Sequence, residues 1–131
     1  MEAVIVFTLG AAGYPLIEIL WRGYTHWTME LLGGVCFLAI YLYEKRNARK
    51  TLLNRCLTGC VIITSMELIC GIIVNKILGW SVWDYSAMPV NFMGQICITY
   101  SALWFLLAIP IIYFCDVIRK LFYEHIMKEC Q

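Results

Sequence analysis

The chain has 131 residues, 62% of them hydrophobic, and a mean hydropathy of +0.75. Only 15% of its residues are charged, against roughly 25% in soluble domains, and this much apolar surface excludes an ordinary soluble fold of this size. The net charge of +1 also argues against nucleic acid as a partner, because it is too small for binding through bulk charge. We therefore predict a single integral membrane domain over residues 1–131.

Four stretches are long and apolar enough for transmembrane helices, which need about 20 residues, with a range of roughly 17–25. They run over about residues 3–21, 27–43, 53–78 and 95–115. The expected fold class is all-α, a four-transmembrane-helix bundle, because an open sheet leaves unsatisfied backbone groups in lipid. Glycines that would allow close approach between these helices are Gly33, Gly34, Gly59 and Gly71.

The first stretch has no basic segment before it, so we interpret it as a retained span and not a cleaved signal peptide. Pro15 lies inside it, as Pro110 lies inside the fourth stretch, and each removes a backbone hydrogen bond and can kink its helix.

Four ionisable residues follow one another at four-residue steps across the link between the first and second stretches: Glu18, Arg22, His26 and Glu30. In a continuous helix they would form one ladder on a single face. Gly23 weakens that continuity, and a tight turn would instead fold Glu18 and Glu30 toward each other. Either geometry concentrates charge at this boundary of the membrane.

Basic residues predict the orientation of the chain. The segment EKRNARKTLLNR (44–55), which links the second and third stretches, contains five, and the C-terminal segment contains three, which together are eight of the ten in the chain. We expect this link and both termini to be cytoplasmic, in a multi-pass membrane protein. The link between the third and fourth stretches then faces outward.

Glu67 lies well inside the third stretch. A charge near the bilayer centre costs about 2.5–3.5 kcal/mol on insertion scales, and such residues face the bundle interior, a partner or a wet cavity. One interpretation is a polar clamp that only fixes helix packing. The other is a ligand or ion site, in which Arg22 pairs with one of the nearby acids and another carboxylate stays available for a cation.

The outward link combines aromatic and polar side chains in the segment GWSVWDYSAMPVNFMGQIC, residues 79–97. An aromatic belt at the membrane interface accounts for its tryptophans, but aromatic faces also suit a cationic or flat ligand. The ligand-binding candidates in this segment are Trp80, Trp83, Asp84, Tyr85, Asn91 and Gln95.

The C-terminal segment, residues 116–131, alternates apolar and charged residues with helical periodicity, and places His125 on its apolar side. It predicts either an amphipathic helix on the inner leaflet or an extension of the fourth span. The seven cysteines are scattered through apolar stretches without metal-ligand spacing, so we interpret them as small hydrophobic residues and predict no metal site and no cofactor.

Several segments together resemble the small bacterial membrane proteins catalogued as putative ABC-transporter type IV. They are GYPLIEILWRGYTHWTMELLGG (13–34), ELICG (67–71), WSVWDYSAMPVNFMGQIC (80–97) and YSALWF (100–105). The resemblance implies a four-helix inner-membrane protein involved in transport, with a polar motif on the outside. It does not identify a substrate.

The expected function is that of a transport component, permease-like or channel-like, with a polar acidic and aromatic site near the outer face. Four spans are few for a complete pathway, so we expect a homo-oligomer or other membrane subunits, surrounded by membrane lipids. The sequence has no GxxxxGK[ST] phosphate loop, and an ATPase would be a separate subunit.

Two alternatives stay open. One is a membrane-embedded enzyme acting on lipid or envelope substrates, although no catalytic residue can be named. The other is a regulatory or interaction subunit that uses the basic link.

Overall fold

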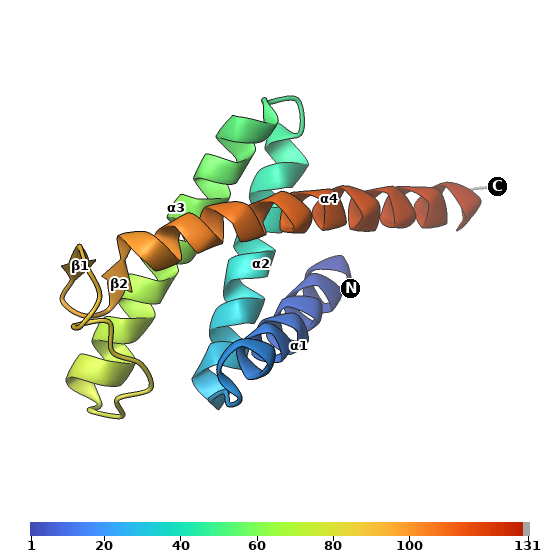
Figure 1. Ribbon diagram of the computed structural model, residues 1–131. Coiled ribbons are helices and arrows are strands. Elements are labelled where there is room, and N and C mark those ends of the chain that lie inside the picture. Colours follow the sequence, from blue (N-terminus) through green and yellow to red (C-terminus); the bar gives the residue numbers. More distant parts are fainter. Residues whose placement is uncertain (130–131) are drawn as a thin grey trace.

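The computed structural model describes the backbone of residues 1–129 and the side chains of residues 1–124. Its main elements are four long helices, α1 (Glu2–Arg22), α2 (Trp27–Asn47), α3 (Leu52–Gly71) and α4 (Ile98–Glu129). A π-helical segment, η1 (Ile72–Ile77), continues α3, and two short strands, β1 (Asn91–Phe92) and β2 (Ile96–Cys97), pair antiparallel ahead of α4 (Figure 1). The all-α prediction is confirmed, and the small hairpin was not predicted.

The link between α1 and α2 is a turn and not a continuous helix. Gly23 ends α1 in the left-handed conformation, with φ +81°, and its N–H donates to the carbonyl of Ile19. His26 then caps α2, its ring accepting a hydrogen bond from the backbone N–H of Thr28. The four-residue ladder is therefore interrupted, and of the two expected geometries the structure has the turn.

Glycines bring α1 and α2 into close contact. A methyl group on Gly33 would lie 2.4 Å from Cβ of Tyr14 and 2.7 Å from the carbonyl oxygen of Gly10. One on Gly10 would lie 2.6 Å from the carbonyl oxygen of Gly33. Only hydrogen fits at these two positions, so the backbones of the two helices approach as closely as small residues permit.

Two further glycines place α3 against its neighbours. A methyl group on Gly59 would lie 3.2 Å from Cβ of Ala108 on α4, and one on Gly71 would meet the side chain of Gln95 at 2.5 Å. The prediction that Gly59 and Gly71 allow close approach is confirmed, as it is for Gly33. Gly71 in particular lets the segment before α4 pack onto the end of α3.

Three helices are long and apolar enough to cross a membrane: Glu2–Arg22, the combined α3 and η1 over Leu52–Ile77, and α4 over Ile98–Glu124. These make the chain a multi-pass membrane protein. The second predicted span is α2, a helix of 21 residues that contains the charged residues Glu30, Glu44 and Lys45. Among the described residues, α2 is not one of the helices that are apolar enough to cross a membrane. Helix α4 begins at Ile98, so Gln95 precedes the fourth span and is not part of it.

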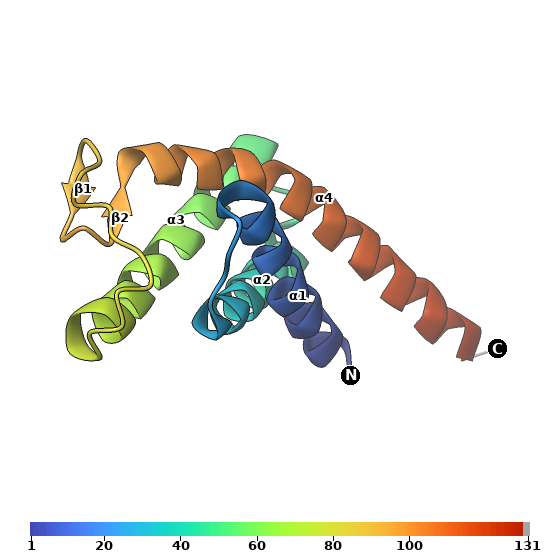
Figure 2. The same ribbon diagram turned by 60° about the horizontal axis from the view of Figure 1, so that its bottom comes forward.

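The helices do not form a simple bundle of parallel axes. Helix α4 crosses α3 steeply in both ribbon views (Figures 1 and 2), and Figure 2 shows that it changes direction about midway along its length. Pro110 lies inside this helix. Proline removes a backbone hydrogen bond and accounts for such a bend. Beyond the bend α4 continues to Glu129, which matches the predicted helix extension; the side chain of His125 lies outside the described residues.

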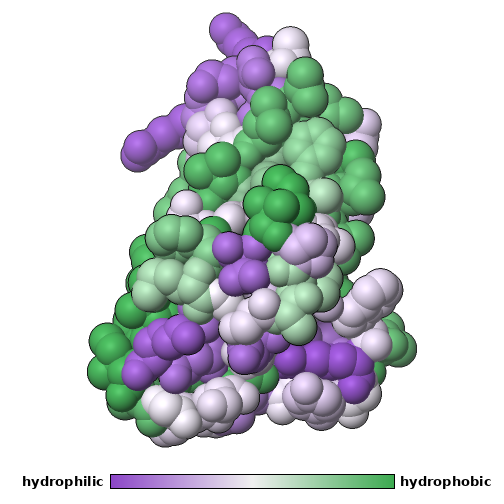
Figure 3. Space-filling view, turned by 60° about the vertical axis from the view of Figure 1, so that its left-hand side comes forward, coloured by the Kyte–Doolittle hydropathy of each residue, from purple (hydrophilic) through white to green (hydrophobic). Residues whose placement is uncertain are grey.

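Polar residues gather mainly at the two ends of the molecule, with apolar residues over most of the surface between them (Figure 3). We call the end with the α1–α2 turn and residues 78–97 the loop end, and the end with the α2–α3 link the link end. Along α3 and η1 the exposed apolar side chains include Leu57, Val61, Ile69 and Ile73. Such a surface is suited to contact with lipid acyl chains.

Candidate functional site

The centre of the candidate site is the carboxylate of Glu67, which is 2% exposed. Its two oxygens accept hydrogen bonds from different parts of the chain. The indole N–H of Trp104 on α4 donates to Oε2 at 2.8 Å, and the hydroxyl of Tyr85 donates to Oε1 at 2.9 Å. The loop end and α4 therefore converge on one acidic side chain near the C-terminal end of α3.

Tyr85 reaches Glu67 because the segment before α4 folds back on itself. The backbone N–H of Tyr85 donates to the carbonyl of Gly94 at 2.7 Å. Gly94 has φ +68°, and a methyl group there would lie 2.4 Å from Oγ of Ser86, so glycine is required. The ring of Tyr85 stacks on that of Tyr100, with centroids 4.6 Å apart, which fixes the direction of its hydroxyl.

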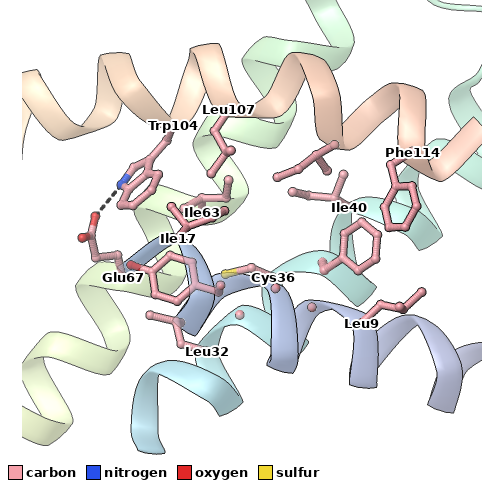
Figure 4. Close-up of a pocket in the computed structure, with 16 residues that line it drawn as sticks. Leu9, Ile17, Leu32, Cys36, Ile40, Ile63, Glu67, Trp104, Leu107 and Phe114 are labelled. Carbon is pink, nitrogen blue, oxygen red and sulfur yellow. Dashed lines mark hydrogen bonds between the residues drawn. The ribbon is translucent and has the colours of Figure 1, made fainter. Parts of the chain in front are cut away.

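Two adjoining cavities lie beside Glu67. The first has a volume of about 200 Å³ and runs between the α1–α2 pair and helices α3 and α4, with Glu67 in its lining. Figure 4 shows Glu67 and Trp104 at one end of this cavity and Leu9 and Phe114 at the other. The second, about 220 Å³, is lined by Glu18, Arg22, Tyr85 and aromatic and aliphatic residues of α1 and α4. Tyr14 and Trp104 line both cavities.

The second cavity contains a neutralised ion pair. Arg22 donates to Oε1 of Glu18, and the hydroxyl of Thr25 donates to Oε2 of the same carboxylate at 2.5 Å. Arg22 also lies over the ring of Tyr24, with its guanidinium carbon 4.5 Å from the ring centroid. The sequence left Glu18, Glu30 and Glu67 open as partners of Arg22, and in the structure Arg22 pairs with Glu18.

A second group of polar contacts connects the segment before α4 to η1, the continuation of α3. Asn75 donates to Oε1 of Gln95 at 2.8 Å and accepts from the backbone N–H of Val82 at 2.7 Å, while the indole N–H of Trp83 donates to the carbonyl of Gln95 at 3.0 Å. Gln95 is 1% exposed and Trp83 is 6% exposed. The aromatic-belt interpretation is therefore wrong for Trp83, which is an internal anchor of the loop.

The remaining candidates lie apart from the carboxylate. His26 packs against Trp80, with ring centroids 5.8 Å apart, and Glu30 is exposed on α2. Asn91 is exposed and holds the loop, donating to the carbonyls of Ser86 and Met88. Asp84 is also exposed, and the hydroxyl and backbone N–H of Ser86 that donate to it hold the pKa of its carboxyl below the usual range.

Tyr85 remains a neutral phenol at physiological pH. Burial raises its pKa above the ordinary value, and the neighbouring carboxylate of Glu67 raises the pKa further because it disfavours a second negative charge. The hydroxyl can therefore donate to a carboxylate or accept from a protonated carboxyl, whichever form Glu67 takes.

Sequence reasoning missed three contributors to this site: Trp104, Tyr14 and Asn75. Trp104 and Tyr14 sit within apolar spans, where an aromatic residue is expected to be plain core. The signal for Trp104 was its indole N–H, a donor that needs a partner when buried, together with an acid inside another span that needs a donor. Asn75, inside the third predicted stretch, was a polar residue left without an assigned role.

A separate group of charges lies near the link end. Its members Glu44 and Arg55 are buried, and Asp116 and Arg119 are partly exposed. Arg55 of α3 donates through Nε to Glu44 of α2 at 2.5 Å and through Nη2 to Asp116 of α4 at 3.1 Å. Arg119 donates to Asp116 at 2.9 Å and to the carbonyl of Glu44 at 3.2 Å. We call these four residues the link-end cluster. It joins three helices, and the sequence interpretation had assigned the basic residues of this region only to orientation.

The arrangement defines a multi-pass helical membrane protein with a buried carboxylate in the lining of one of two adjoining cavities. A family model described as "Putative ABC-transporter type IV" matches residues 6–131, so the chain belongs to this family. The resemblance inferred from the sequence motifs is thereby confirmed. No curated protein and no solved structure matches the chain.

Proposed function

We propose that the chain is the membrane component of a transporter, permease-like or channel-like, and that Glu67 belongs to its ligand site. The observation that carries this proposal is the position of Glu67. A buried carboxylate faces a cavity between helices, three of which are long and apolar enough to cross a membrane, and its hydrogen bonds come from a loop and from a second helix. Ionisable residues placed in this way inside membranes mark substrate and ion pathways.

The two cavities support this function because together they extend from the loop end into the membrane layer. Arg22 and Glu18 line the cavity nearer the loop end, and Glu67 lines the deeper one, with Trp104 between them. The loop end is expected to face outward from the distribution of basic residues. A ligand would then pass from the ion pair to the carboxylate.

Four helices enclose too little space for a complete pathway, so the proposed protein works as a homo-oligomer or with other membrane subunits. Energy from ATP would require a separate ATPase, because the sequence has no GxxxxGK[ST] phosphate loop. Affinity purification from native membranes after cross-linking would show whether such a subunit accompanies the chain.

The experiment compares cells that lack the gene with cells that carry it, by mass spectrometry of small molecules inside the cells and in the medium. We expect at least one solute to be distributed differently in the deletion strain. The wild-type gene should restore the distribution, and Glu67→Gln should not.

Glu124→Gln is the matched control. It removes one carboxylate from an exposed position on the extension of α4, far along the chain from the site, and should behave as wild type. Identical profiles in all strains, or full restoration by Glu67→Gln, would contradict the proposal.

A further inference from the structure

We infer that the first cavity takes an amphipathic cation, with its ammonium head at Glu67 and its apolar body along the channel between α1 and α4. The inference rests on the site of the proposed function and names the chemical class of its ligand. It depends on three features of the described residues: the shape of the cavity, the balance of charge around Glu67 and the aromatic rings beside it.

The cavity is polar at one end and apolar along its length. Glu67 is the only Asp, Glu, Lys, Arg or His in its lining, as far as the chain is described, and the walls otherwise consist of aliphatic, aromatic and small residues. Its volume of about 200 Å³ exceeds that of an engineered cavity of roughly 150 Å³ that binds benzene. Figure 4 places the carboxylate at one end and Phe114 at the other. A ligand with a charged head and an apolar tail fits this arrangement.

The charge at the polar end is not balanced by the protein. Within residues 1–124, no basic side chain lies within salt-bridge distance of Glu67. Arg22 is neutralised by Glu18. A carboxylate has about four acceptor positions, and Tyr85 and Trp104 occupy two. An ammonium group would supply both the missing charge and further donors.

Aromatic rings line the same end. Tyr14 and Trp104 both border the cavity, with centroids 6.0 Å apart and planes inclined at 47°. Their faces attract a cation as well as contacting apolar groups. A fatty acid would instead meet the carboxylate of Glu67 with a like charge, and a neutral alcohol would gain no charge interaction.

The test uses the purified protein in nanodiscs of zwitterionic lipid and measures quenching of tryptophan fluorescence by chain-brominated dodecylamine. Chain-brominated dodecanol and dodecanoate serve as the neutral and anionic probes, and each probe is expressed as a mole fraction of the lipid. We expect the amine to quench tryptophan fluorescence saturably, and its half-saturating mole fraction to be about tenfold lower for wild type than for Glu67→Gln. The variant binds more weakly because it lacks one charged hydrogen bond. The alcohol should not distinguish the two proteins.

Glu67→Gln is expected to fold. The amide oxygen can accept from Trp104, and the amide NH₂ can donate to the hydroxyl of Tyr85, so both hydrogen bonds persist without the charge. Glu124→Gln is the control for removal of an exposed acid. Gly13→Leu is an independent variant: Gly13 lines the cavity, no atom lies within 4 Å of an added Cβ, and the larger side chain fills the space. It should weaken binding of amine and alcohol alike.

Equal quenching of wild type and Glu67→Gln by the amine would overturn the inference, as would equal binding of all three probes, which would show a site for any lipid tail. The outcome is separable from that of the proposed function. Amine-selective binding without any change of solute distribution in cells would remove the transport role and leave the ligand class. A changed solute distribution without amine selectivity would leave the transport role and remove the ligand class.

Discussion

Glu44 and Glu67 are two acids buried to nearly the same extent, 1% and 2% exposed, and the structure accommodates them in opposite ways. Glu44 belongs to the link-end cluster, where two arginines and two carboxylates balance each other and join α2, α3 and α4. Glu67 receives only neutral donors, Tyr85 and Trp104.

This difference indicates different roles. A cluster with equal numbers of arginines and carboxylates leaves no net charge for a ligand. Breaking it leaves a buried ion without its partner in an apolar environment, so the cluster holds helices together. A carboxylate held by neutral donors has no cation beside it, and two of its acceptor positions stay available. We therefore assign stability to the link-end cluster and ligand binding to Glu67, and the following changes test that division.

The largest loss of stability is expected from Arg55→Gln. It removes the central cation of the link-end cluster and leaves Glu44 buried without its partner, at a cost of about 3–5 kcal/mol. The free energy of unfolding in mixed micelles, measured by denaturant titration, gives the value. Arg49→Gln is the control because Arg49 is exposed on the α2–α3 link. Equal stability of the two variants would show that the cluster does not hold the helices.

The next effect is expected at the interface of α1 and α2. Gly33→Ala places a methyl group 2.4 Å from Cβ of Tyr14, and overpacking of this kind costs about 1–3 kcal/mol. Because Tyr14 lines both cavities, amine binding should weaken as well. Gly13→Ala, with no atom within 4 Å of the added group, should leave stability unchanged or slightly higher. The same titration distinguishes them, and equal losses would contradict the close approach.

Glu67→Gln should change stability by less than about 1 kcal/mol, because the amide keeps both hydrogen bonds. Glu44→Gln should cost clearly more, because it leaves the link-end cluster with an excess of positive charge. Denaturant titration of both variants provides the comparison. If Glu67→Gln were the more damaging change, Glu67 would be a packing residue and the division of roles would be wrong.

The smallest effect is spectroscopic. Burial and the charge of Glu67 raise the pKa of Tyr85, so this phenol should remain protonated in the folded protein above the ordinary tyrosine pKa of about 10. Its contribution to stability is then present below that pH and falls as the pH rises further, since the unfolded chain releases the proton first. Alkaline titration by ultraviolet absorbance should give the same folded-state amplitude for wild type and Tyr85→Phe. A smaller amplitude in the variant would show that Tyr85 ionises normally.

Hydropathy alone was sufficient for the helices, because the length of an apolar run is a local property. It did not reveal that α4 crosses α3 steeply, nor that residues before Ile98 form a hairpin, since both depend on contacts between distant segments. For the site, the buried acid and the aromatic loop could be named from the sequence, because a carboxylate in an apolar run and clustered tryptophans are conspicuous. Trp83 was placed at the surface because nothing local distinguishes an anchoring indole from an interfacial one.

What the sequence determined by itself is an all-helical membrane protein of a recognisable family, with one acid at a depth where charge is costly. Only the tertiary structure decided which acid is neutralised and which is not. Arg22 pairs with Glu18, one turn before it in α1, whereas Glu67 comes to lie beside Trp104 and Tyr85, neither of which is basic. Electrostatic partners depend on distance in space, and that distance is set by where helices end and how closely their glycines let them approach.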